Sequence, residues 1–173
     1  MSTQTGRLAE WFDAFLIDFY QTEKQLIKQV TRLSEAGLTA ELRKALSPTE
    51  TEGAVHVERL QQILKLRKLK TDNSTNGLAT AFLATAKAAI GRKGKPSIAK
   101  DLAILNVGKQ MMHYRIACYQ SLHIAAETLG LDLPTMLLEQ CLREDQNTDA
   151  YLNQVAQNVL YIQFEDAKQD PEN

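Results

Sequence analysis

Apolar residues recur in alternating steps of four and three along the first part of the chain, and this spacing constrains the fold more than any other feature. The series is Phe12, Leu16, Phe19, Glu23, Leu26, Val30 and Leu33. Such steps place side chains on one face of an α-helix, whereas a half-buried strand would alternate every second residue. The sequence therefore predicts one long helix over about residues 6–36, with Gly37 as its C-terminal cap residue.

A second long helix is predicted over about residues 39–68, with Thr39 as its N-cap. Pro48 lies inside this segment. Because proline lacks a backbone N–H and its ring collides with the carbonyl four residues earlier, at Lys44, we expect a kink or a break there.

Three more helices follow, separated by a polar connector at 71–76 and a basic one at 91–96. They are a short alanine-rich helix at about 77–90, a long helix capped by Ser97 and ending near Leu129, and a last helix with Pro134 in its first turn that runs to about residue 165. The sequence predicts an all-α four-helix bundle with one short accessory helix, in a single domain over residues 1–173 whose tail at about 166–173 frays.

Composition excludes several classes of protein. Twenty basic residues against twenty-one acidic ones leave a formal charge of -1, which gives no general attraction for nucleic acid or an anionic membrane. The N-terminus lacks an apolar signal region, and the longest mostly apolar stretch, 78–90, is too short to span a bilayer. Cys118 and Cys141 lack metal-ligand spacing and are expected to be free, buried thiols. These features predict a cytoplasmic protein.

Four polar side chains interrupt the apolar helix faces: Glu23 in the first helix, Glu52 and His56 one turn apart in the second, and Glu144 in the last. A buried carboxylate is costly unless it is paired, protonated or bound to a metal. Each of these residues could instead lie at the edge of the core or in an ion pair. Carboxylates and imidazoles on facing helices can also hold two iron or manganese ions, so the four residues are candidate metal ligands.

Four segments, taken together and in order, resemble a known family. They are DFYQTEKQL at 18–26, EGAVHVERL at 52–60, HYRIACY at 113–119 and EDQNTD at 144–149. They are similar to motifs of the YciE/YciF family of ferritin-like bacterial stress proteins. The resemblance implies a ferritin-like bundle, frequent homodimers, induction under stress and a di-metal site. Glu23, Glu52, His56 and Glu144 match positions at which that family carries metal ligands.

The helix that carries HYRIACY departs from the family pattern. Where the family has two glutamates, this chain has Met112 and Arg115. A thioether is a poor ligand for iron or manganese, and a guanidinium offers no lone pair. One hypothesis is that Arg115 replaces the metal charge by pairing with the carboxylates. The alternative is a site for one iron or manganese ion formed by Glu52, His56 and Glu144, with or without Glu23.

These alternatives correspond to two functions. The first is a metal-free stress protein with a structural or interaction role, present as a homodimer. The second is an iron- or manganese-dependent oxidoreductase, or a ferroxidase-like protein, with an altered ligand set. Trp11 and Phe15 suit a dimer interface, and they equally suit packing under the short accessory helix. Substrate and protein partners are not specified by the sequence.

Overall fold

The computed structural model describes residues 3–71, 77–91, 97–162 and 165. The helices are α1 (Thr3–Ala36), α2 (Ala40–Ala45), α3 (Pro48–Thr51), α4 (Gly53–Leu66), α5 (Gly77–Ile90), α6 (Ile98–Thr128) and α7 (Asp132–Val155), and a π-helical stretch (Ala156–Leu160) continues α7. The described residues contain no strand, so the predicted all-α class is confirmed. Most of both predicted connectors and the predicted frayed tail lie outside the described residues.

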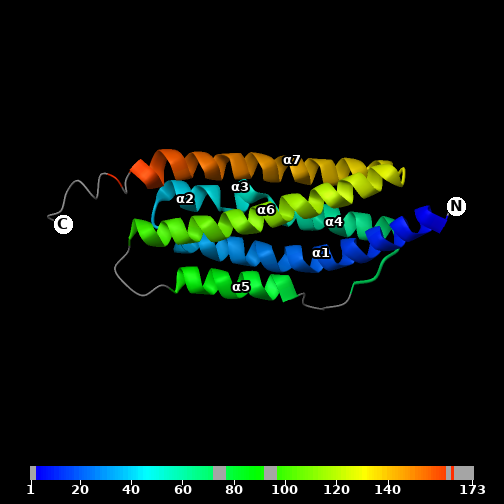
Figure 1. Cartoon of the computed structure of the whole chain (residues 1–173), viewed down its shortest axis with the longest axis horizontal. Helices are drawn as coiled ribbons and strands as arrows, with labels where there is room; N and C mark the ends of the chain where they lie inside the picture. The colour runs from blue at the N-terminus through cyan, green and yellow to red at the C-terminus, as the bar shows by residue number, and fades with distance from the viewer. Residues whose placement is uncertain (1–2, 72–76, 92–96, 163–164, 166–173) are drawn as a thin grey trace.

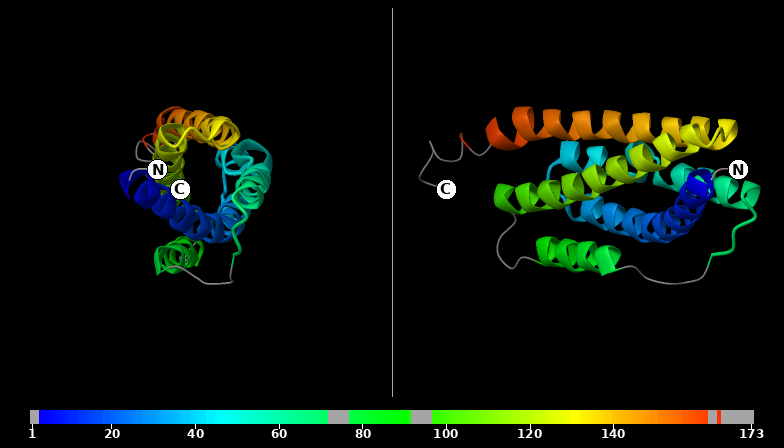
Figure 2. Two further views of the ribbon diagram at one scale, coloured as in Figure 1. Left: turned by 90° about the vertical axis from the view of Figure 1, so that its right-hand side faces the viewer. Right: turned by 45° about the vertical axis from the view of Figure 1, so that its right-hand side comes forward.

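Four helical columns form the bundle, as the two perpendicular views show (Figures 1 and 2). The columns are α1, the broken series α2–α4, α6 and α7. Helix α1 packs against α6 and α4, and α7 packs against the same two helices. Helix α5 lies outside the bundle against α1 and α6, which confirms the predicted accessory helix. Among the described helices, none is long and apolar enough to cross a membrane.

The second column is broken twice rather than once. The break expected at Pro48 is present: α2 ends at Ala45, and the Ser47 hydroxyl accepts a hydrogen bond from the Glu50 N–H to cap the next helix. A further break, which the sequence did not predict, occurs at Glu52, whose backbone is left-handed with φ 45°. A Cβ on the following Gly53 would lie 2.6 Å from Ile27 on α1, so this close approach of the two helices requires glycine.

The corner between α1 and α2 is fixed by Asp101 of α6. Its carboxylate accepts hydrogen bonds from the backbone N–H groups of Leu38 at 2.7 Å and Thr39 at 2.8 Å. Thr39 occupies the predicted N-cap position, but its hydroxyl makes no capping hydrogen bond, and neither does the hydroxyl of Ser97. The cap acceptor therefore comes from a distant helix, which local sequence signals do not reveal.

Two apolar clusters fill the bundle, one toward each end, and a polar layer separates them. On α1, Phe19 belongs to one cluster and Leu26 to the other, with the buried Glu23 between them. On α6, Met111 belongs to one cluster and Cys118 to the other, with the buried Arg115 between them. The predicted apolar face of α1 is buried throughout, which places Glu23 in the core rather than at its edge.

Candidate functional site: a buried charge network

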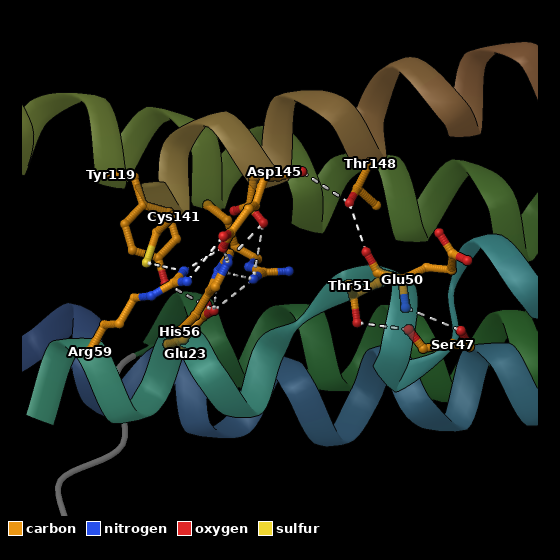
Figure 3. A network of polar contacts seen from close by, with 12 residues as sticks. Glu23, Ser47, Glu50, Thr51, His56, Arg59, Tyr119, Cys141, Asp145 and Thr148 are labelled. Carbon is orange, nitrogen blue, oxygen red and sulfur yellow. Dashed lines mark hydrogen bonds and ion pairs between the residues drawn. The ribbon is translucent and has the colours of Figure 1, made fainter. Parts of the chain in front are cut away.

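Arg115 stands at the centre of the polar layer, with 1% of its surface exposed. Its Nη2 atom lies 2.9 Å from Glu23 Oε1, 3.0 Å from Asp145 Oδ1 and 2.8 Å from His56 Nδ1. These three partners come from α1, α7 and α4, and they converge in the close view of the site (Figure 3). One guanidinium nitrogen on α6 thus contacts a polar side chain from each of the other three columns. We refer to Glu23, His56, Arg59, Arg115, Glu144 and Asp145 as the charge network.

The contacts of His56 determine which of its ring nitrogens carries the proton. A guanidinium can only donate hydrogen bonds, so Nδ1 must accept one from Arg115. Nε2 therefore carries the proton and donates to Glu144 Oε2 at 2.8 Å. Burial, together with the positive charge of Arg115, lowers the pKa of His56 to about 3. The imidazole is consequently neutral at physiological pH.

Arg59 and Glu144 form the outer part of the network. Arg59 Nη2 donates to Glu144 Oε1 at 3.0 Å, and Nη1 contacts Oε2, so the pair is bidentate. Their side chains are 18% and 28% exposed, in contrast to the inner residues. Partial burial opposes ionisation of Glu144, but hydrogen bonds from Arg59 and His56 outweigh it and lower the pKa. Arg59 Nη1 also lies 3.7 Å from Cys141 Sγ, a thiol whose pKa burial raises to about 12.

The inner carboxyl groups of Glu23 and Asp145 share a single positive charge, that of Arg115. Burial raises the pKa of both groups, to about 8 for Asp145, although Arg115 opposes the shift. The Tyr119 hydroxyl donates to Glu23 Oε1 at 3.2 Å, whereas neither oxygen of Asp145 has a hydrogen-bond partner among the described residues. We therefore place a proton on the carboxyl group of Asp145 at neutral pH and leave Glu23 ionised. With that proton the network holds two cations and two anions, which limits the cost of burying it.

The structure brings together three of the four predicted ligand residues. Glu23 and His56 are fully buried in the network, and Glu144 joins it from the partly exposed side. Glu52 lies outside the charge network, because it is the N-cap residue of α4 and its left-handed backbone does not continue the helix face that carries His56. With Glu50 and Glu144, it lines a surface hollow of about 210 Å³. Met112, the other residue that departs from the family pattern, is buried, so its thioether is not exposed to solvent.

Asp145 and Arg59 are network residues that the sequence analysis missed. Glu144 was expected to interrupt the buried face of the last helix, but the fully buried residues of α7 are Leu138 and Asp145, and Asp145 is one position further along. The steps of three and four from Leu138 through Cys141 to Asp145 fit the chain equally well and could have signalled this face. Arg59 lies three residues after His56, so the two side chains share one side of the helix, and this spacing could have indicated that Arg59 joins the site.

An iron or manganese centre needs lone pairs that converge on an empty position. Here the lone pairs of Glu23, Asp145 and His56 converge on Arg115 Nη2, at hydrogen-bond or ion-pair distances. The guanidinium supplies the positive charge in that position and already uses Nδ1 of the only imidazole in the network. The residues present therefore do not fit a di-iron or di-manganese centre.

Fold and site together define a class of protein: a helical bundle of ferritin-like architecture whose core holds a carboxylate–imidazole–guanidinium network. The chain belongs to the family described as "Domain of unknown function (DUF892)", whose model matches residues 7–163. The resemblance predicted from the sequence is confirmed.

Three comparisons support the assignment. Protein YciF of Escherichia coli strain K12 is 29% identical over 148 residues, which cover 85% of this chain and 89% of that protein. The crystal structure of the E. coli stress protein YciF superposes with a TM-score of 0.80 at 27% identity, covering 91% of this chain and 97% of the other. The structure of YcfI from Rhodopseudomonas palustris gives a TM-score of 0.75 at 25% identity, covering 88% and 97% of the two chains.

Proposed function

We propose that this chain is a bacterial stress-response protein with a structural or interaction role, in which Arg115 replaces the metal of a ferritin-like centre. The observation that carries the proposal is the contact of one guanidinium nitrogen with Glu23, His56 and Asp145 at 2.8–3.0 Å. The stress role rests on similarity to YciF, which is named a stress protein and matches most of this chain.

Electrostatics explains why an added cation would be disfavoured. A divalent ion bound by the same oxygens would lie within a few ångströms of the guanidinium. Two charges at about 4 Å repel by about 4 kcal/mol per pair of unit charges, even at an effective dielectric constant of about 20. Arg115 cannot relieve this repulsion by losing its proton, because arginine stays charged in proteins. Iron or manganese would have to expel a fully buried side chain from the bundle.

We also propose that the protein is a cytoplasmic homodimer. Both cysteines are free and buried, as in proteins of a reducing compartment. Trp11 is 46% exposed, and its ring centroid lies 5.1 Å from that of Phe15 with the two rings tilted, which gives α1 an aromatic surface near its N-terminus. Light scattering at micromolar protein should give the mass of two chains; the mass of one chain would contradict the dimer.

The test of the metal-free role is elemental analysis of protein purified without chelator, with absorption spectra before and after addition of ferrous iron. We expect iron and manganese far below one equivalent per chain, and oxidation of ferrous iron no faster than in buffer. Stoichiometric iron or manganese would refute the metal-free role, and catalytic turnover of ferrous iron or peroxide would establish the oxidoreductase.

A further inference from the structure

The outer side of His56 carries a second group of donor atoms that the charge network does not explain. A ring nitrogen of His56, Cys141 Sγ and a carboxylate oxygen of Glu144 all lie within 4.8 Å of one another. Nε2 is the ring nitrogen that contacts Glu144, at 2.8 Å from Oε2. Figure 3 shows His56 and Cys141 near each other with Arg59 beside them. Arg115 contacts the other ring nitrogen, Nδ1, so this donor group and the Arg115 contacts use opposite sides of one imidazole.

These donors have the chemistry of a zinc site rather than an iron site. Thiolate, imidazole and carboxylate are the three protein ligands that zinc uses, at about 2.0–2.3 Å, commonly with water in a fourth position. A thiolate favours zinc-like ions over manganese, magnesium and calcium. Tetrahedral ligands at such bond lengths are about 3.2–3.8 Å apart. The widest donor separation must therefore close by about 1 Å before one cation can be bound by all three donors.

Arg59 occupies the approach to these donors. It forms the bidentate pair with Glu144 and lies 3.7 Å from Cys141 Sγ, so a cation must displace it. Displacement is feasible because the side chain is 18% exposed and borders a hollow of about 310 Å³. Glu139 and Gln140 line the same hollow and offer the displaced guanidinium new acceptors.

We propose that His56 Nε2, Cys141 Sγ and the Glu144 carboxylate form a binding site for one zinc-class divalent cation, and that Arg59 closes this site when the cation is absent. The site is separate from the position held by Arg115 and does not depend on the proposed stress role. It also predicts zinc, rather than iron or manganese, as the metal that the protein can take up.

Cation binding releases one proton to solvent and moves another within the His56 ring. The Cys141 thiol loses its proton to solvent and becomes the thiolate ligand, so one proton is released for each cation bound. The His56 proton moves from Nε2 to Nδ1, where Asp145 Oδ1 at 3.6 Å is the nearest carboxylate able to accept a hydrogen bond from it. Arg115 then gives up its hydrogen bond to Nδ1 and keeps its contacts with Glu23 and Asp145.

The test uses cobalt(II), which substitutes for zinc and gives a near-ultraviolet charge-transfer band when a thiolate binds it. The purified full-length chain and the Arg59→Ala variant are titrated with cobalt(II), and zinc is then added in competition. We expect one equivalent of cobalt with the thiolate band, at least about tenfold tighter binding in Arg59→Ala, and loss of the band on adding zinc.

The two cysteines provide a matched control. Cys118 and Cys141 are both buried thiols of the same apolar cluster, but only Cys141 is in the donor group. In the Arg59→Ala background, Cys141→Ser should abolish the band and Cys118→Ser should keep it, with circular dichroism verifying the fold of each variant. The proposal is overturned if neither the unmodified chain nor Arg59→Ala shows a thiolate band. It is also overturned if Cys118→Ser removes the band.

This outcome is independent of the elemental analysis for iron and manganese. Stoichiometric iron with no cobalt–thiolate band would refute both proposals. A cobalt–thiolate band without bound iron or manganese would support both. A cobalt–thiolate band in a protein that also binds iron would refute only the metal-free role.

Discussion

Arg115 and Arg59 pair with carboxylates in the same network, but their environments differ. Arg115 is 1% exposed and faces two carboxyl groups and an imidazole, whereas the side chain of Arg59 is 18% exposed and forms one bidentate pair with Glu144. Buried ion pairs are expensive to break, because the remaining partner stays charged without solvent. Pairs near the surface contribute little, because water replaces the lost partner. Arg115 therefore contributes more to the stability of the bundle than Arg59, and Arg59 can be displaced at a lower cost in free energy.

The largest expected effect is that of Arg115→Met. The substitution leaves Glu23 and Asp145 buried without their cation, so we expect the free energy of unfolding to fall by about 3–5 kcal/mol. Urea denaturation followed by circular dichroism measures this loss. In the triple variant with Glu23→Gln and Asp145→Asn, most of the loss should be recovered, because no uncompensated charge remains. A loss below about 1 kcal/mol for Arg115→Met alone would contradict the central position of Arg115.

The second prediction concerns Arg115→Glu, which turns the central cation into a further carboxylate. We expect this variant to be unstable alone and to gain thermal stability with manganese or ferrous iron, because a metal that binds only the folded state stabilises it by mass action. The unmodified chain serves as the control and should show no such gain in melting temperature. If the variant folds stably and still ignores both metals, the metal-replacement account loses its support.

The third prediction is a pH dependence with a defined window. The pKa of Asp145 is raised from 3.8 to about 8, so between these values the folded state binds more protons than the unfolded one, and stability falls as pH rises. Glu23 acts in the same direction. The pKa of His56 is lowered from 6.5 to about 3, which has the opposite effect below pH 6.5. The fall in the free energy of unfolding with rising pH should therefore be clearest between about pH 6.5 and 8.

Asp145→Asn is the variant that tests this assignment. The asparagine keeps the shape of the protonated carboxyl and cannot ionise, so the decline in unfolding free energy between about pH 6.5 and 8 should be reduced. Glu139→Gln, an exposed change on the same helix, should leave the decline as it is. An unchanged slope in Asp145→Asn would place the titrating proton elsewhere.

The smallest expected effect is that of Arg59→Ala on stability. Because the Arg59–Glu144 pair is partly exposed, its loss should lower the free energy of unfolding by about 1 kcal/mol or less. Urea denaturation beside Arg115→Met gives the comparison directly. A loss as large as that of Arg115→Met would show that the two arginines do not differ as their exposure implies.

Sequence reasoning predicted the helices well because their signals are long and local. The face from Phe12 to Leu33, the break at Pro48 and the short helix at 77–90 all follow from spacing and residue type, and the structure has them. The resemblance to the YciE/YciF family also identified Arg115 as the residue that departs from the pattern, and the structure pairs it with Glu23.

The rest of the site depends on contacts between helices, which local sequence patterns do not reveal. A shift of one position on α7 decides whether Glu144 or Asp145 enters the core, and packing against α6 and the α2–α4 column makes that choice. Glu52 leaves the helix face of His56 because its own backbone is left-handed, at the point where the next residue, Gly53, closely approaches Ile27 on α1. That approach is a tertiary contact and has no signal in the segment itself.

The protonation pattern of His56 shows whether Arg115 occupies the place of a metal, because Nδ1 is the atom that faces Arg115. Nitrogen-15 NMR of the full-length protein, freed of zinc by dialysis against a chelator, can assign the imidazole signals across the range from about pH 5 to 8. We expect a neutral ring with the proton on Nε2, no titration in this range and no change on adding ferrous iron or manganese. A proton on Nδ1, a titrating ring, or signals shifted by added iron or manganese would contradict the replacement of the metal by Arg115.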